Sequence, residues 1–137
     1  REAVEPTKPC LAYAMLAKCM SEEGAGSHAE IFLDPLCGSN TIAEVALGSE
    51  FAPRLFCVCG DVSELALAAA GENAARLSTQ CGHNPARVDL VRWDARRLPL
   101  RRFSVDRIAT QPPAGRFVGE RPAARLYAAA LGEFRRV

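Results

Sequence analysis

Acidic residues follow three of the apolar segments that the sequence predicts to be strands: Asp34, Asp61 and Asp94. The carboxyl ends of parallel strands meet at one edge of a sheet, and ligands of such sheets bind there. A carboxylate such as Asp61 can accept two hydrogen bonds from a ribose diol. Asp94, which Ala95 follows, can accept one from an exocyclic amino group such as that of adenine. The pattern therefore predicts a nucleoside-binding edge.

The first of these strand ends opens a loop of mostly small residues, DPLCGSNT over 34–41. Small side chains let a backbone approach a ligand closely, and the helix predicted after the loop offers unpaired N–H groups to a carboxylate. The loop's single glycine, Gly38, does not make the three-glycine fingerprint of dinucleotide sites. A nicotinamide or flavin enzyme is therefore the weaker fit.

Alternating helices and short apolar strands must position these residues. We expect helices over 10–20 (after Pro9), 41–47, 64–77 (capped by Ser63) and 123–134, and strands over 31–33, 55–59, 88–93 and 105–110. This order predicts an α/β, Rossmann-like fold, a parallel sheet with helices on both faces. We expect residues 1–137 to be the N-terminal portion of one domain with only its first four strands. The rest of the domain or a partner protein would then cover the open sheet edge.

The net charge of +1 conceals an uneven distribution along the 137 residues. Residues 1–75 hold 4 basic and 11 acidic residues, whereas residues 76–137 hold 13 basic and 5 acidic ones. This basic half could bind a polyanion such as RNA. The alternative interpretation is a compositional bias toward arginine, with the charged faces simply exposed to water. The apolar runs are too short to cross a bilayer, so we expect no membrane association.

Six cysteines lie at positions 10, 19, 37, 57, 59 and 81, without a Cys-x-x-Cys pair. His28 and His83 lack zinc-ligand spacing, so we expect no metal site. Cys57 and Cys59 alternate with apolar residues of a predicted strand and are expected to be buried thiols. Reduced cysteines favour an intracellular location, either the cytoplasm or, if a transit peptide precedes this segment, an organelle such as the mitochondrion.

The sequence resembles the class I S-adenosylmethionine (SAM)-dependent methyltransferases, and within them the RNA-modifying group associated with THUMP RNA-binding domains. The resemblance lies in the helix at 11–16 (LAYAML), the loop at 34–39 (DPLCGS) and the segment at 94–100 (DARRLPL). It implies SAM as the cofactor and methyl transfer to an exocyclic base amino group, most often N2 of a guanosine in tRNA or rRNA.

The resemblance also implies roles for particular residues. Asp61 would bind the SAM ribose, and Asp94 with Ala95 the adenine. Thr7 would reach the methionine carboxylate. The residues around the methionine moiety would be Asp34, Cys37, Gly38, Ser39 and Asn40. The candidate RNA-binding residues are Arg96, Arg97, Arg101, Arg102 and Arg116.

The family's catalytic motif is Asn or Asp, Pro, Pro, then Tyr or Phe, and here it is Gln111-Pro112-Pro113-Ala114. In the family the first side chain and a following carbonyl accept hydrogen bonds from the target amino group, and the ring stacks on the flipped base. Gln111 is one methylene longer and Ala114 has no ring. Asn40 replaces a usual glycine; it tolerates positive φ, but its side chain would crowd the SAM space.

These three departures predict a weakened or lost activity. The first hypothesis is an RNA methyltransferase, and its alternative is a catalytically weak or inactive scaffold that binds RNA or protein in a larger ribonucleoprotein assembly. A small-molecule or protein methyltransferase is a third possibility. Structural roles are the alternative for individual residues: Pro112-Pro113 as a strand end, Asp61 and Asp94 as caps, and Trp93 as a core residue.

Overall fold

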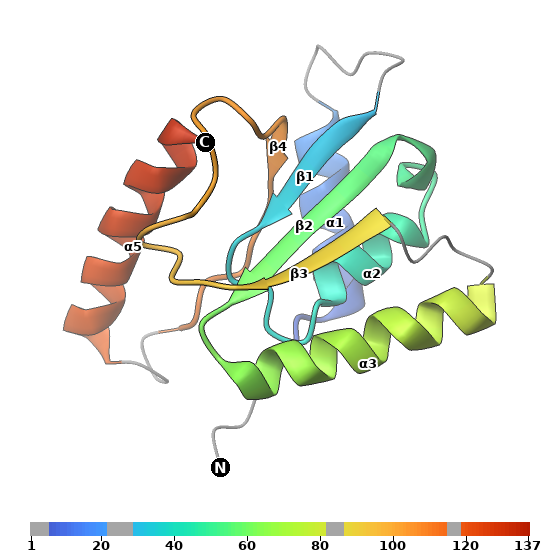
Figure 1. The fold of residues 1–137 in the computed structure, drawn as a ribbon, viewed down its shortest axis with the longest axis horizontal. Coiled ribbons are helices and arrows are strands. Elements are labelled where there is room, and N and C mark those ends of the chain that lie inside the picture. The colour runs from blue at the N-terminus through green and yellow to red at the C-terminus, as the bar shows by residue number, and fades with distance from the viewer. Residues whose placement is uncertain (1–5, 22–28, 82–86, 115–118) are drawn as a thin grey trace.

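The computed structural model describes residues 6–21, 29–81, 87–114 and 119–137 (Figure 1). The helices are α1 (Pro9–Met20), α2 (Thr41–Leu47), α3 (Glu64–Cys81) and α5 (Glu120–Arg136), with a short 3-10 helix η1 (Ala52–Arg54). The strands are β1 (Glu30–Asp34), β2 (Leu55–Asp61), β3 (Val88–Arg92) and β4 (Arg107–Ile108). No helix among the described residues is long and apolar enough to cross a membrane.

The strands form one sheet in the order β3-β2-β1-β4, and every pairing is parallel. The β1–β2 register pairs Asp34 with Cys59, and the β2–β3 register pairs Asp61 with Arg92. The carboxyl ends of these three strands therefore lie at the same edge of the sheet. The order of elements and the parallel sheet confirm the predicted Rossmann-like α/β fold.

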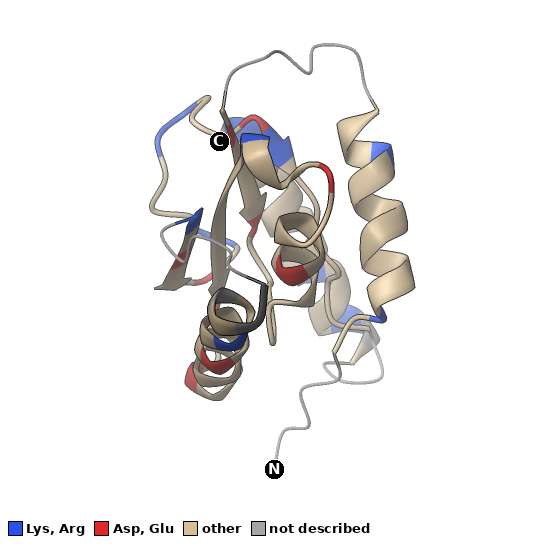
Figure 2. Cartoon of the chain, turned by 90° about the vertical axis from the view of Figure 1, so that its right-hand side faces the viewer, with Lys and Arg blue, Asp and Glu red and all other residues tan. Residues whose placement is uncertain are grey.

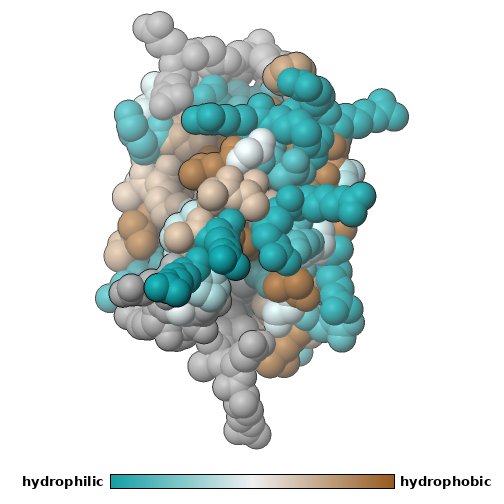
Figure 3. All heavy atoms as spheres, turned by 90° about the vertical axis from the view of Figure 1, so that its left-hand side faces the viewer, coloured by the Kyte–Doolittle hydropathy of each residue, from teal (hydrophilic) through white to brown (hydrophobic). Residues whose placement is uncertain are grey.

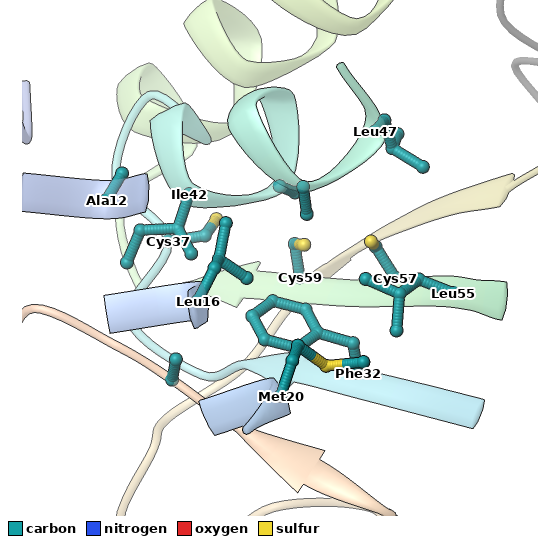
Figure 4. Close-up of a cluster of buried hydrophobic side chains, with 13 residues drawn as sticks. Ala12, Leu16, Met20, Phe32, Cys37, Ile42, Leu47, Leu55, Cys57 and Cys59 are labelled. Atoms are coloured by element: carbon teal, nitrogen blue, oxygen red, sulfur yellow. The ribbon is translucent and has the colours of Figure 1, made fainter. Parts of the chain in front are cut away.

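Alternate residues of each strand face two separate cores. Phe32, Cys57 and Cys59 belong to the core that α1 and α2 cover, and Figure 4 shows Leu16, Met20 and Ile42 pointing from those helices toward the strands. On the other face, Leu33 and Val58 pack with Trp93, Leu98 and residues at the end of α5. Helices on both faces are thus confirmed, and the two strand cysteines are buried free thiols as expected.

The fourth strand is shorter than the predicted 105–110, because only Arg107 and Ile108 pair regularly with β1. The Val105 N–H donates to the carbonyl of Val137 at 3.1 Å, so the chain is tied to the end of α5 before it joins the sheet. The Ala109 N–H still donates to Leu33 O at 3.2 Å. β4 lies at one end of the strand order, and its outer side faces a groove between α1 and α5 lined by Met15, Cys19, Ile108 and Phe134.

A buried carboxylate ties the amino end of the sheet together. Glu30 of β1 is 2 % exposed and pairs with Arg54 of η1 and, at 3.0 Å, with Nε of Arg107 on β4. Burial raises the pKa of Glu30, but the hydrogen bonds from the two guanidinium groups outweigh this and leave the pKa below its ordinary value. Arg107 also donates to the carbonyl of Cys19 at 3.1 Å, which joins α1 to the same network.

We expect Glu30→Gln to lower the free energy of unfolding by about 3–5 kcal/mol, because it leaves two guanidinium groups without their shared countercharge. Glu64→Gln is the matched control, since it breaks the pair between Glu64 and Arg92 on the surface, where the Glu64 side chain is 75 % exposed. That change should cost no more than about 1 kcal/mol. Urea denaturation of both variants measures the difference, and equal losses would contradict the role given to Glu30.

Candidate functional site

The loop between β1 and α2 is fixed by backbone hydrogen bonds to the end of β2. The Cys37 N–H donates to Gly60 O at 2.9 Å, and the Gly38 N–H donates to Oδ2 of Asp61 at 3.0 Å. Gly38 has a φ of 52°, so the turn uses a backbone conformation that glycine adopts without strain. The loop predicted from the sequence therefore joins the carboxyl ends of β1 and β2 through its backbone.

Asn40 adopts the left-handed conformation expected of it, with φ of 75°. Its side chain is 1 % exposed, and its Oδ1 has no hydrogen-bond partner among the described residues. A buried amide oxygen without a donor costs free energy. The turn thus survives the replacement of glycine, and the effect of the Asn40 side chain on ligand space stays a prediction.

Trp93 is hydrogen-bonded to this loop through its indole ring. Its indole Nε1–H donates to the carbonyl of Pro35 at 3.0 Å, and the residue is 6 % exposed. A Cβ at Gly60 would lie 2.2 Å from Cε2 of the Trp93 ring, so only glycine fits at that position of β2. Trp93 is the core residue that its apolar strand suggested, but its hydrogen bond to the loop has no signal in the sequence pattern.

The Ser39 carbonyl and the Cys37 thiol of the same loop both face other parts of the chain. The Ser39 carbonyl accepts a hydrogen bond from Nδ2 of Asn73 on α3 at 2.9 Å. The Cys37 thiol is 7 % exposed, and burial raises its pKa far above the ordinary range. A thiol that stays protonated is a poor nucleophile.

Asp34 is buried beneath the loop and accepts a hydrogen bond from the Leu36 N–H at 3.3 Å. Burial raises the pKa of its carboxyl to about 7, and the neighbouring charge of Asp61 acts in the same direction. No ion pair of the described residues places an Arg or Lys on either carboxylate. Within the described part of the chain, Asp34 and Asp61 therefore lie close together without a positively charged partner.

Asp61 and Asp94 both accept hydrogen bonds from nearby residues. Asp61 accepts the Ser63 N–H on Oδ1 at 2.9 Å, so each oxygen already holds one hydrogen bond. Asp94 accepts hydrogen bonds from the Arg96 backbone N–H and from its Nε and Nη2 at 2.6–2.9 Å. The hydrogen bond from the Arg96 side chain lowers the pKa of Asp94. Both carboxylates are thus oriented, and Asp94 carries a countercharge.

The four residues of the degenerate motif follow β4 at the same edge. Gln111, Pro112 and Ala114 are exposed and Pro113 is half-buried. The Tyr127 hydroxyl, on α5, donates to the Pro113 carbonyl and so fixes the end of the motif. Ala95, in contrast, is buried at 3 % exposure beside Asp94. The role of Tyr127 was not predicted, because a tyrosine inside a helix gives no indication of which loop it contacts.

The remaining predicted residues are Thr7 and the five candidate RNA-binding arginines. Thr7 precedes α1 and its side chain has no hydrogen bond among the described residues. Arg96, Arg97, Arg101 and Arg102 are all exposed on the segment that runs from the end of β3 to the start of β4. Arg116 lies outside the described residues.

Asp34→Asn should stabilise the protein at high pH. The folded state binds the Asp34 proton more tightly than the unfolded chain, whose carboxyl titrates near 3.8, so the native protein loses stability as the pH rises from there through about 7. We expect the variant to be more stable than the native protein by about 2–4 kcal/mol above that range and equal to it at acid pH. Urea denaturation across pH measures this; a difference independent of pH would contradict the account.

Comparison with known proteins agrees with this geometry. The sequence model of the RMKL-like methyltransferase domain family (UPF0020) matches residues 2–137. The tRNA (guanine(6)-N(2))-methyltransferase THUMP3 of Bos taurus is 33% identical over 134 residues, which cover 93% of this chain and 25% of that protein. The chain therefore spans about a quarter of the length of this relative.

Two solved structures share the fold. TrmN from Thermus thermophilus is 30% identical with a TM-score of 0.70, over 92% of this chain and 33% of that one. A possible methylase from Clostridium difficile 630 has a TM-score of 0.71 at 20% identity, over 98% of this chain and 43% of that one. The four-stranded parallel sheet, the DPLCGS loop and the family match lead to one conclusion: the chain belongs to the RMKL-like methyltransferase domain family, within the class I SAM-dependent methyltransferases.

Proposed function

We propose that this chain binds SAM at the carboxyl edge of its sheet and takes part in methyl transfer to an exocyclic amino group of RNA, guanine N2 of a tRNA or rRNA. The observation that carries the proposal is the β1–β2 junction, where Asp61 holds the Gly38 N–H beside the buried Asp34. The name of the THUMP3 relative, a tRNA guanine-N2 methyltransferase, supports the choice of substrate.

The charges at this edge fit SAM. The cofactor carries a sulfonium cation and an ammonium group, and the edge presents Asp34 and Asp61 without an Arg or Lys paired to either among the described residues. A bound cation stabilises nearby carboxylates in their ionised form. Asp61 would bind the ribose, Asp94 and Ala95 the adenine, and the methionine moiety would lie along the 37–40 loop with Thr7 near its carboxylate.

The residues after β4 would orient the target base. When bound, SAM supplies an electrophilic methyl group. The Gln111 side-chain oxygen and the Pro112 carbonyl would accept the N–H groups of the base amine, which directs its nitrogen lone pair toward the cofactor. Tyr127 keeps this segment in place through Pro113. Ala114 offers no ring for the base to stack on, so the base would be held less firmly than by an aromatic residue.

A non-catalytic scaffold that binds RNA in a larger assembly is the second candidate. The Asp94–Arg96 pair favours it, because an adenine amino group would have to compete with a guanidinium for the same carboxylate. The longer side chain at Gln111 also favours it, since a displacement of about 1 Å of a positioning group can lower a rate by roughly a hundredfold.

Calorimetric titration with SAM tests the cofactor site. We expect Asp61→Asn to weaken SAM binding by about tenfold or more, because the amide cannot accept both N–H groups of the loop and of Ser63 while also holding the ribose. Asp89→Asn, an exposed position on β3, should leave the affinity unchanged. Absence of binding by the native protein would favour the scaffold, and equal affinity of the two variants would exclude Asp61 from the site.

Restoring the motif tests the methyl-transfer step. We expect Gln111→Asn combined with Ala114→Tyr to raise methyl transfer to unmodified tRNA or rRNA by about tenfold or more, since the amide oxygen moves back and the base gains a stacking partner. Both positions are exposed, so thermal stability should be unchanged. Incorporation of labelled methyl groups measures the gain. An unchanged rate in a variant that binds SAM would contradict the assignment of this motif.

A further inference from the structure

An exposed phenylalanine precedes β4 in an unfavourable backbone conformation. Phe103 is 78 % exposed and has a φ of 54°. The left-handed region suits glycine, and a bulky side chain there is an uncommon and strained arrangement. The ring belongs to neither hydrophobic core. Packing within the described part of the chain therefore does not explain why this position carries a phenylalanine.

Hydrogen bonds to the last turn of α5 hold the backbone around this ring. The Phe103 N–H donates to Arg136 O at 3.1 Å, and the Ser104 N–H donates to Val137 O at 2.6 Å. The Arg136 side chain donates to the carbonyls of Leu98 and Leu100 at 2.8 and 2.7 Å. The backbone of this segment is thus fastened to the end of α5 on both sides of Phe103, and the ring is exposed among the described residues.

One arginine, Arg102, contacts the ring, and Arg101 and Arg135 lie nearby in the sequence or at the end of α5. The guanidinium carbon of Arg102 lies 5.2 Å from the centre of the Phe103 ring, within the range of a cation–π contact. Arg101, Arg102 and Arg135 are exposed, and none of them has an ion-pair partner among the described residues. The nearby carboxylate of Glu133 is held by Arg136 at 2.7 Å. Within the described part of the chain, Arg101, Arg102 and Arg135 thus give this surface an excess of positive charge over the single exposed carboxylate nearby, Asp106, whose Oδ2 accepts the Ile31 N–H at 2.7 Å.

This surface lies on the side of α5, away from the cofactor edge. Figure 3 shows this side, with hydrophilic side chains over one part of it and apolar ones over another. Figure 2 shows acidic and basic positions interspersed on the opposite side. The Asp106 N–H donates to Ile31 O at 3.0 Å near the start of β1, while Asp34 ends the same strand. Phe103 is therefore near the amino end of the sheet, opposite the proposed SAM site.

We propose that Phe103 and Arg102 form a stacking site for an unpaired base of RNA, with Arg101 and Arg135 binding the adjoining phosphates. Aromatic rings and guanidinium planes stack on the bases of single-stranded RNA, and unpaired arginines attract its phosphates. Because hydrogen bonds to α5 fix the backbone at Phe103, little backbone freedom is lost on stacking. The proposal rests on the proposed function only in taking RNA as the partner, and it places a second RNA contact far from the methyl-transfer motif.

Phe103→Gly separates binding from folding, because glycine adopts the positive φ without strain and should keep or raise thermal stability. We expect it to weaken binding of the full-length protein to a labelled single-stranded RNA by about tenfold, and binding to a duplex of the same length much less. Arg102→Gln should reduce the single-strand affinity and its salt dependence. The controls are Leu65→Ala, at a residue 61 % exposed on α3, and Arg76→Gln on the same helix; both should bind as the native protein does.

Fluorescence anisotropy gives these affinities, and calorimetry with SAM on the same preparations keeps the two proposals apart. Weaker single-strand binding by the Phe103 variant with unchanged SAM binding supports the stacking site. If the native protein does not bind SAM but Phe103→Gly still binds single-stranded RNA more weakly than the native protein, the methyltransferase proposal is overturned. The stacking site is then still supported. Equal affinity of native protein and Phe103→Gly for single-stranded RNA, or no binding by either, would overturn the stacking site.

Discussion

The Trp93 indole ring lies against the backbone of Gly60 with no space for a side chain between them. This close packing lets the indole N–H reach the Pro35 carbonyl, while the Gly60 carbonyl accepts the Cys37 N–H. One ring therefore fixes both the end of β2 and the loop that leaves β1. The position of Asp61 against Gly38, and with it the proposed cofactor site, depends on that contact.

The departures from the family motif differ in what they do to this framework. Asn40 accepts the left-handed turn, so the loop keeps its course at the cost of a buried oxygen without a partner. Gln111 and Ala114 are exposed after β4 and change no packing. The Asp94–Arg96 pair competes for the carboxylate that would bind adenine. The parallel sheet of the family is thus present together with all three departures, Asn40, Gln111 and Ala114.

Much of the fold could be predicted from the sequence because it depends on local patterns. Apolar segments ending in Asp34, Asp61 and Asp94 indicated the strands, and Ser63 caps α3 through its contact with the Ala66 N–H at 3.3 Å. The length of β4 could not be predicted, since Val105, the first residue of the predicted strand, bonds to Val137, far along the chain. The contacts of Trp93 and Tyr127 with loops depend on tertiary packing in the same way.

The site residues also differ in whether local sequence patterns or tertiary packing determine them. The strand-end carboxylates follow from topology, whereas the raised pKa of Asp34 follows from its burial and from the approach of Asp61, which only the packed structure brings about. The positive φ of Phe103 gives no sequence signal either, because phenylalanine rarely adopts it.

Trp93, the single tryptophan of the chain, can report on whether the loop between β1 and α2 binds SAM. Its indole N–H is bonded to that loop, so a ligand that contacts residues 37–40 should change its environment. We predict a saturable change in the intrinsic fluorescence of Trp93 on titration with SAM, reduced in the Asp61→Asn variant. A fluorescence signal that does not change up to millimolar SAM, or the same change in that variant, would contradict SAM binding by this loop.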